Sequence, residues 1–387
     1  MEEITLAIRY SIIIPTYNRL QQLLLTLASF EAQTYSKQQF EVIVADDGST
    51  DGTKEAVEGF HTSYPLLYVS HQEQRGRSAN RNLGLRHARG DYIVFCDADF
   101  LVLSEFLNII DYYHRKYPKA VLSGFPHSWD NAYTHYYPEF SPEEKEHFRN
   151  TMIPSGLWNP DFETATEIIP LITTEDILRQ TGTLSKLVFP SRIPPSTKEQ
   201  FIKRDVAPWM LLVTRCVSMK RSYFTRTGGF NEQFVLYGLE DWDLGYRLHR
   251  MKVPFYCIKE VIGYHQEHPT YLRGDTLNLD NLKIMFKNYG FRDSSLNLFA
   301  LVSPNEDLEK YKDTLRVLRK GFRSKRTRSS ALLLKKTIRI VAKHFYDPNH
   351  ALAHKKSLER IKRKARGRRS RVARVLQEML AKSEERI

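Results

Sequence analysis

The chain has 387 residues, 41% of them hydrophobic and 17 of them proline, so one large or two ordinary globular domains are expected rather than disorder. Its three cysteines (Cys96, Cys216 and Cys257) are scattered, which argues against a disulfide framework or a zinc site and for a reducing compartment. No run of about 18 apolar residues occurs, and Arg9 interrupts the first apolar stretch. Neither a membrane span nor a signal peptide is therefore expected.

The charge is unevenly distributed along the chain. Residues 312–387 hold 25 Lys and Arg against 6 Asp and Glu, whereas the remainder holds 33 against 39. A strongly basic region thus follows a slightly acidic one, and the two are expected to meet different partners.

Apolar strands alternate with amphipathic helices through the first part of the chain. Strands are expected at residues 10–14, 40–45, 66–69 and 92–95, and helices at residues 20–30, 53–60 and 78–88. This alternation predicts an open, mostly parallel α/β sheet that binds its ligands at the carboxyl ends of the strands. The acidic clusters Asp46-Asp47 and Asp97-x-Asp99 each follow such a strand.

The pattern weakens after residue 125 and returns near residue 216. Residues 126–215 are rich in Pro, Trp, Tyr and His, and no elements are assigned there. Beyond them, strands are expected at residues 216–219 and 254–262, and helices at residues 221–225, 239–248 and 275–288. The basic region contains amphipathic helical stretches such as residues 331–345.

The two acidic clusters each allow two interpretations. Asp97 and Asp99 could hold Mg²⁺ or Mn²⁺, which take carboxylates together with substrate phosphate oxygens, or they could cap a solvated turn. Asp46 and Asp47 could accept hydrogen bonds from a base or ribose, or could form an Asp/Gly turn before a helix.

Two further positions carry possible chemistry. Glu240 and Asp241 open a helix, where acidic residues are favoured by the helix dipole, but a carboxylate there could also act as a general base. His265 follows an apolar strand and is either a packed histidine or a ligand for a first-row metal. No single cluster decides between these alternatives.

Their order along the chain carries a resemblance. The segments SIIIPTYNR (11–19), VIVADDGSTDGT (42–53), RSANRNLGLRHARGDYIVFCDADF (77–100), GGFNE (228–232) and YGLEDWDLGYRL (237–248) together resemble glycosyltransferase family 2. The resemblance implies a GT-A fold and an inverting enzyme that uses a nucleotide sugar. The second half is similar to the galactosyltransferase-type end of the family, which chondroitin-synthase domains share.

The resemblance also implies roles for residues of the nucleotide-binding half. Asp47 would hydrogen-bond uracil, which is the basis for expecting a UDP-sugar. Either Arg75 or Arg77 would lie near the base or the diphosphate, and Asp97 would face the ribose or a metal-bound water. The nucleotide pocket would be lined by Pro15, Thr16, Tyr17 and Asn18.

The metal and the base follow from the same resemblance. Asp99 would ligate Mn²⁺ or Mg²⁺, with His265 as a further ligand. Asp241 matches the catalytic base, and Glu240 beside it would hold acceptor hydroxyls. Asp241 would take the acceptor proton as that oxygen attacks the anomeric carbon, while the metal and an arginine stabilise the departing diphosphate.

The expected organisation is a GT-A domain over residues 1–305 and a basic helical tail over residues 306–387. Within the domain, residues 1–125 would bind the nucleotide, 126–215 would form an insert on the acceptor side, and 216–305 would carry the base. The aromatic residues of the insert could stack on sugar rings or form a satellite core. Trp242, beside the expected base, could likewise stack on a sugar ring or pack into the core.

The basic tail has three candidate partners. An anionic membrane surface is preferred, because each basic residue near it adds about 1 kcal/mol. An anionic acceptor polymer is the next candidate, nucleic acid is not expected to be the partner, and a solvated face without a ligand is also open.

The expected acceptor is a glycan or a lipid-linked or envelope polymer, and the expected location is cytoplasmic, with the inner membrane face as an alternative. The rival function is a non-catalytic carbohydrate- or nucleic-acid-binding protein on a transferase scaffold. The sequence predicts no particular oligomeric state.

Overall fold

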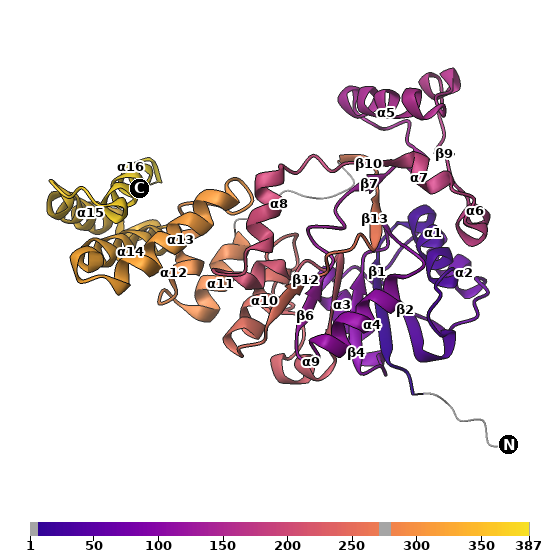
Figure 1. Ribbon diagram of the computed structural model, residues 1–387, viewed down its shortest axis with the longest axis horizontal. Helices are drawn as coiled ribbons and strands as arrows, with labels where there is room; N and C mark the ends of the chain where they lie inside the picture. Colours follow the sequence, from indigo (N-terminus) through magenta and orange to yellow (C-terminus); the bar gives the residue numbers. More distant parts are fainter. Residues whose placement is uncertain (1–6, 271–279, 387) are drawn as a thin grey trace. The chain divides into compact units, whose positions relative to one another are not determined.

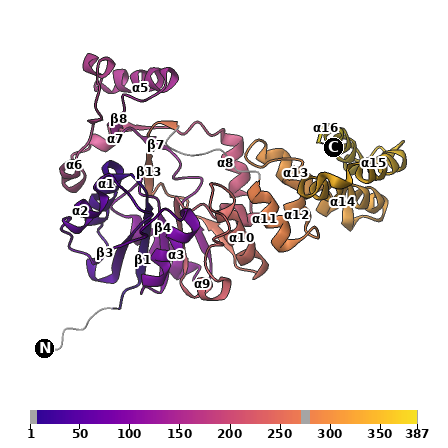
Figure 2. The same ribbon diagram turned by 180° about the vertical axis from the view of Figure 1, so that it is seen from behind.

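The computed structural model describes residues 7–270 and 280–386, and its contacts divide the chain into two compact units (Figures 1 and 2). Unit 1 spans residues 1–193 and 209–277, and unit 2 spans residues 194–208 and 278–387. The sequence suggested a boundary at residue 306, shortly before the charge rises at residue 312; in the structure, helices before residue 306 already belong to unit 2.

Unit 1 begins with the strand and helix alternation that the sequence predicts. Its first elements are β1 (Tyr10–Thr16), α1 (Leu20–Glu31), η1 (Lys37–Gln39), β2 (Phe40–Asp46), α2 (Thr53–Glu58), β3 (Leu66–Ser70), α3 (Arg77–His87), β4 (Tyr92–Cys96), β5 (Phe100–Val102), α4 (Phe106–Lys116) and β6 (Val121–Ser123). The unassigned insert contributes β7 (Asn131–Ala132), β8 (His135–Tyr136), α5 (Pro142–Ser155), η2 (Pro160–Glu163), β9 (Ile169–Pro170), α6 (Thr174–Arg179), α7 (Thr183–Leu187) and β10 (Val188–Phe189). After η3 (Pro208–Leu211) come β11 (Cys216–Lys220), α9 (Ser222–Thr227), α10 (Glu240–Arg250), β12 (Phe255–Cys257) and β13 (Gly263–Gln266).

The main sheet has seven strands in the order β12-β6-β11-β4-β1-β2-β3. All neighbours are parallel except β11, which runs antiparallel between β4 and β6. Because Thr16 pairs with Asp46 and β4 lies on the other side of β1, the acidic clusters after β2 and β4 lie at one edge of the sheet. The expected open, mostly parallel α/β sheet is confirmed.

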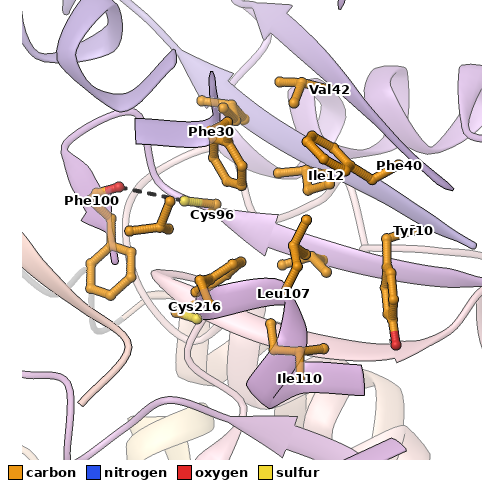
Figure 3. Packing of buried hydrophobic residues seen from close by; sticks show 14 of the residues in the cluster. Tyr10, Ile12, Phe30, Phe40, Val42, Cys96, Phe100, Leu107, Ile110 and Cys216 are labelled. Carbon is orange, nitrogen blue, oxygen red and sulfur yellow. Dashed lines mark hydrogen bonds between the residues drawn. The ribbon is translucent and has the colours of Figure 1, made fainter. Parts of the chain in front are cut away.

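Helices cover both faces of this sheet. Ile12, Ile14, Val42 and Val94 share a buried cluster with residues of α1 and α4, part of which is drawn in Figure 3. On the other face α3 packs so closely that a Cβ on Gly84 would lie 2.5 Å from the Ile13 side chain. The alternation of buried side chains therefore places one helical layer on each side of the strands.

Asp111 on α4 fastens this helix to the start of the sheet. Its carboxylate accepts hydrogen bonds from Arg9 Nε (2.5 Å), Tyr10 Oη (2.9 Å) and Arg115 Nε (2.7 Å), although the residue is only 6% exposed. A buried carboxylate with three charged or polar donors is stabilised in its ionised form.

Most aromatic residues of the insert form a satellite core. Tyr133, Tyr136 and Phe148 are buried together, and Trp158 packs against the same cluster. Trp209 is 1% exposed and contacts Trp242 edge-on, while Trp242 Nε1 donates to Met210 O at 3.1 Å; the two tryptophans thus pack into the protein.

One predicted strand is shorter than expected. The pattern over residues 254–262 predicts a single strand, but the chain leaves the main sheet after Cys257. Ile258 and Ile262 turn into the core instead, and β13 then joins a second sheet with the order β10-β7-β13-β5. A short two-stranded sheet pairs β8 with β9. Hydrophobic periodicity cannot separate a strand from a buried connection, because both bury apolar side chains.

Unit 2 is helical. It contains α8 (Pro195–Ile202), α11 (Asp280–Tyr289), α12 (Ser294–Leu298), α13 (Leu308–Arg323), α14 (Lys325–Tyr346), η5 (Pro348–His350), α15 (Ala351–Ala365) and α16 (Arg371–Arg386). The part of the predicted helix 275–288 before residue 280 lies outside the described residues. Helix α14 contacts α11, α12, α13, α15 and α16. The buried Lys312 ammonium donates to the carbonyls of Gln200 (2.5 Å) and Lys203 (2.8 Å), so α8 is fastened to α13.

Candidate active site

Three potential metal ligands converge from the turn after β4 and from the end of β13 and the residues that follow it. Asp99 Oδ2 lies 3.5 Å from His265 Nε2 and 3.2 Å from His268 Nε2, and the donor atoms of all three residues lie within 4.8 Å of one another. The backbone fixes this arrangement, because His265 pairs with Phe100 and Gln266 N donates to Asp99 O at 2.8 Å. Asp99 Oδ1 is buried without a hydrogen-bond partner among the described residues. One carboxylate oxygen thus faces two imidazoles and the other is unsatisfied, and such a donor set suits a divalent cation.

The protonation states of these residues fit the same purpose. Burial, together with the positive charge of Arg215, lowers the pKa of His265 to about 3. Burial opposes ionisation of Asp99, but His265 and His268 outweigh it and hold the pKa of Asp99 well below its usual range. At neutral pH the group therefore offers an anionic oxygen and an uncharged His265 imidazole, which are the forms that bind metals.

Asp241 lies in the first turn of α10 and is held by the segment before β11. Its carboxylate accepts hydrogen bonds from Thr214 N (2.9 Å) and Thr214 Oγ1 (3.0 Å). Burial raises the pKa of Asp241 to about 6, with Glu240 adding to the rise and Arg81 opposing it. A carboxylate with a pKa near neutrality is well matched to proton abstraction from a hydroxyl.

Glu240 lies deeper than its neighbour. One of its oxygens is 3.2 Å from Arg81 Nη1, and the other accepts a hydrogen bond from Gly238 N at 2.9 Å. Both carboxylate oxygens are thus engaged inside the protein, in a residue that is 3% exposed. This arrangement favours a role in holding Arg81 and the start of α10 over the predicted contact with acceptor hydroxyls, and the latter stays a prediction.

Asp97 interacts electrostatically with both Asp99 and Asp241. Its Oδ1 is 3.9 Å from Arg81 Nη2, and its backbone N donates to Arg215 O at 3.1 Å. Burial and the neighbouring Asp99 raise the pKa of Asp97, while the guanidinium groups of Arg81, Arg215 and Arg77 oppose that rise.

Asp47 organises the loop before α3. Its two carboxylate oxygens accept hydrogen bonds from Arg75 N and Gly76 N, both at 2.8 Å. Gly76 has φ +88°, and a Cβ there would lie 2.7 Å from Val235 O, so only glycine lets the loop approach this closely. The side chain of Arg75 is exposed, and that of Arg77 lies 4.5 Å from the ring centre of Tyr237.

The remaining predicted nucleotide residues lie at the end of β1 and directly after it, at the same edge of the sheet. Pro15 is half-buried, and the hydroxyl of the buried Thr16 has no hydrogen-bond partner among the described residues. Tyr17 is exposed. Asn18 bridges to the Asp/Gly turn, since its N donates to Ser49 Oγ and its Oδ1 accepts from Thr50 N, both at 2.8 Å.

Four residues of this site were not predicted from the sequence: Arg81, Thr214, Arg215 and His268. His268 has a local signal, because it lies three positions after His265. Arg215 lies 5.5 Å from the ring centre of Trp129, and its Nη1 is buried without a hydrogen-bond partner within the part of the chain that is described. Nothing local marks Arg81, Thr214 or Arg215 as functional.

Two known sequence families cover the residues that build this site. Residues 11–166 match glycosyl transferase family 2, and residues 208–269 match the family described as the N-terminal domain of galactosyltransferase. The chain carries a family 2 glycosyltransferase domain. The resemblance drawn from the five sequence motifs is thereby confirmed.

Curated relatives of this family 2 domain include several glycosyltransferases. An uncharacterized glycosyltransferase of Bacillus subtilis is 31% identical over 277 residues, covering 67% of this chain and 65% of that protein. Validoxylamine A glucosyltransferase of Streptomyces hygroscopicus subsp. jinggangensis is 30% identical and covers 67% and 55%. Chondroitin synthase of Escherichia coli is 28% identical and covers 67% and 35%. This chain therefore spans between about a third and two thirds of the length of these relatives.

Solved structures agree on the fold of the family 2 domain. The crystal structure of S. aureus TarS with UDP-GlcNAc superposes with a TM-score of 0.50 at 15% identity, covering 87% of this chain and 91% of that one. The predicted GT-A architecture is confirmed by this likeness.

Proposed function

We propose that this chain transfers a sugar from a nucleotide-diphosphate sugar, with UDP as the expected nucleotide, to a hydroxyl group, with inversion at the anomeric carbon. One observation carries the proposal: Asp241, with a pKa of about 6, shares the buried guanidinium of Arg81 with Asp97, which follows the same strand as Asp99. This arrangement supports roles for Asp241 as base, for Asp97 as a donor-side carboxylate and for Asp99 as a metal ligand.

Asp241 acts as the general base in this proposal. Its carboxylate takes the proton of the acceptor hydroxyl as that oxygen bonds to the anomeric carbon, and the bond to the diphosphate oxygen breaks with its electron pair leaving on the nucleotide. Thr214 fixes the orientation of Asp241 through two hydrogen-bond donors. Besides Arg81, which pairs with Asp97, the positive charges of Arg77 and Arg215 act on Asp97, and we assign these two arginines to the diphosphate.

Asp99, His265 and His268 would hold the divalent cation. The orphaned Asp99 Oδ1 and the uncharged His265 fit such an ion, and two imidazoles suit Mn²⁺ better than the harder Mg²⁺. When bound, the cation neutralises charge that develops on the nucleoside diphosphate.

The nucleotide is expected over the ends of β1 and β2. Asp47 is proposed to hydrogen-bond the uracil, for which it would exchange the backbone amides of Arg75 and Gly76 that it now accepts. Thr16, whose buried hydroxyl lacks a partner among the described residues, is proposed to complete the pocket with Pro15, Tyr17 and Asn18.

The names of the relatives support donor candidates to test. A validoxylamine A glucosyltransferase and a chondroitin synthase are among the homologues, and the TarS structure contains UDP-GlcNAc. UDP-glucose and UDP-GlcNAc are accordingly the first donors to assay. A glycan, or a lipid-linked or envelope polymer, is the proposed acceptor.

An anionic membrane surface is the proposed partner of unit 2. Helix α14 contains no acidic residue, and its exposed Arg328, Lys335, Lys336 and Arg339 follow one another at helical spacing around Leu332, which is 54% exposed. None of these four cations forms an ion pair with another described residue. No described helix is long and apolar enough to span a bilayer, so contact would be made at the surface.

The test of the proposed activity is UDP release from UDP-glucose and UDP-GlcNAc in the presence of Mn²⁺. Asp241→Asn should lower the rate by about 10² to 10⁴-fold, the usual contribution of a general base, while UDP binding measured by calorimetry is retained. The matched control is Asp243→Asn, which alters a carboxylate of the same helix that pairs with Arg247 at 2.7 Å instead. Equal rates in Asp241→Asn and the wild type would refute the proposed base.

A further inference from the structure

Arg81 is the buried cation at the centre of the site. It lies on α3 and is 3% exposed, and its guanidinium reaches three carboxyl groups carried by two other parts of the chain. Nη1 lies 3.2 Å from Glu240 and 3.5 Å from Asp241, and Nη2 lies 3.9 Å from Asp97. Burying a charge costs several kcal/mol unless partners offset it, and these carboxyl groups are the partners that offset the charge of Arg81.

Arg81 connects the proposed donor side of the site with the proposed acceptor side. Asp97 follows β4, on the donor side, while Glu240 and Asp241 open α10, on the acceptor side. The guanidinium also lies 5.4 Å from the ring centre of Phe230, which limits where it can move. Because a guanidinium group is rigid and planar, it orients the carboxylates that pair with it and also favours their ionised form.

The groups that face Asp241 come from four places. Arg81 approaches from α3, Glu240 from its own helix, Thr214 from the segment before β11, and Asp97 from the end of β4. Of these, Arg81 is the positive charge, and the other carboxyl groups oppose ionisation of Asp241.

We propose that Arg81 is a positioning residue, which keeps the carboxylate of Asp241 charged and fixes it beside the donor-side carboxylate Asp97. This inference rests on the proposed role of Asp241 as general base. It assigns to Arg81 no contact with the sugar, because the side chain is enclosed by protein groups.

The first measurement does not depend on activity. Side-chain carboxyl carbons of ¹³C-labelled aspartate are titrated by NMR in the full chain, and the Asp241 signal is the one that Asp241→Asn removes. In Arg81→Met the titration midpoint of Asp241 should move upward by about one pH unit or more, as expected when an opposite charge within about 4–6 Å is lost. In Glu240→Gln the midpoint should move downward.

The second measurement is the pH profile of UDP release from UDP-GlcNAc with Mn²⁺. In Arg81→Met the acidic limb should shift to higher pH, so that the loss of rate at pH 7 is partly recovered at pH 8.5. Arg81→Lys keeps the charge but loses the fork; its limb should stay near that of the wild type while its maximal rate falls. A merely structural role would lower the rate equally at every pH.

A matched control separates this effect from general damage. Arg89→Met removes another arginine that pairs with a buried carboxylate, Glu41, at the opposite end of the strands (2.6 Å). It should leave the Asp241 midpoint and the acidic limb unchanged.

The outcomes are distinguishable. If the titration midpoint of Asp241 in folded Arg81→Met equals that of the wild type, the inference is overturned. If Arg81→Met does not fold, the double variant Arg81→Met/Glu240→Gln is used, because it also removes the Glu240 carboxylate that would be left buried and unpaired. The titration midpoint of Asp241 in this double variant must then lie above that in Glu240→Gln alone. If the wild type releases no UDP from any donor, the proposed activity fails, while the NMR titration still decides the role of Arg81.

Discussion

Replacement of His268 by alanine is the sharpest test of the proposed metal site. The imidazole is 2% exposed at its side chain, and its Nε2 lies 3.2 Å from Asp99 Oδ2. Its removal leaves two of the three converging donors in place and disturbs no strand pairing, because β13 ends at Gln266. The expected effect is therefore weaker metal binding in a folded protein.

The size of the effect follows from binding linkage. At a Mn²⁺ concentration 100 times the dissociation constant of the wild type, binding stabilises the folded state by about 2.7 kcal/mol. For a unit of this size that raises Tm by about 5–10 °C. Loss of a direct ligand should weaken affinity about 100-fold, the upper end of what the loss of an outer-shell partner does. The stabilisation then falls to about 0.4 kcal/mol, and the rise in Tm to about 1 °C.

The assay is thermal unfolding of the full chain with a fixed concentration of UDP, with and without Mn²⁺. His114→Ala is the control, because His114 is equally buried but hydrogen-bonds to Ser218 in the core. This variant should have a lower Tm than the wild type yet keep the full rise with Mn²⁺. An undiminished rise in His268→Ala would refute the assignment of His268 as a ligand.

Three further predictions concern the base, the core and the tail. Because the pKa of Asp241 is raised to about 6, its ionised fraction falls from about nine-tenths at pH 7 to about one-tenth at pH 5, so UDP release should fall about tenfold; the residual rate of Asp241→Asn should lack this dependence. Asp111→Asn should lower the free energy of unfolding by about 2 kcal/mol at pH 7 in urea denaturation. Although burial opposes it, hydrogen bonds lower the folded-state pKa of Asp111, so this difference should begin to shrink as the pH falls below about 4 and should be lost as the pH passes through the lower pKa of the folded state; a difference that does not shrink between pH 4 and pH 2 would contradict the account. Reversing Lys335, Lys336 and Arg339 to glutamate should weaken sedimentation with anionic vesicles by at least about 100-fold without affecting UDP release, and unchanged vesicle binding, or binding to RNA alone, would remove the membrane proposal.

The sequence by itself determined the local elements and their order. Strands β1, β2 and β4 and helices α1 and α3 begin and end within about two residues of the predicted positions, because their periodicity depends on near neighbours. The acidic clusters after β2 and β4 were likewise readable as ligand-binding positions, since parallel strands present their carboxyl ends at one edge. The roles of Asp241, Asp99 and His265 came from motif order and remain predictions.

Only the tertiary structure decided which side chains meet. Arg81 and Glu240 are 159 positions apart, and nothing near either residue indicates the other. Strand β11 enters the sheet antiparallel beside β4, and this brings Thr214 to Asp241 and Arg215 to Asp97. The long-range pairing that sets these contacts depends on how strands from distant segments register, and a local pattern of hydrophobic and polar residues carries no information about that register. The acidic residues of the site could thus be identified from the sequence, but the ion pairs that connect them through the buried Arg81 could not.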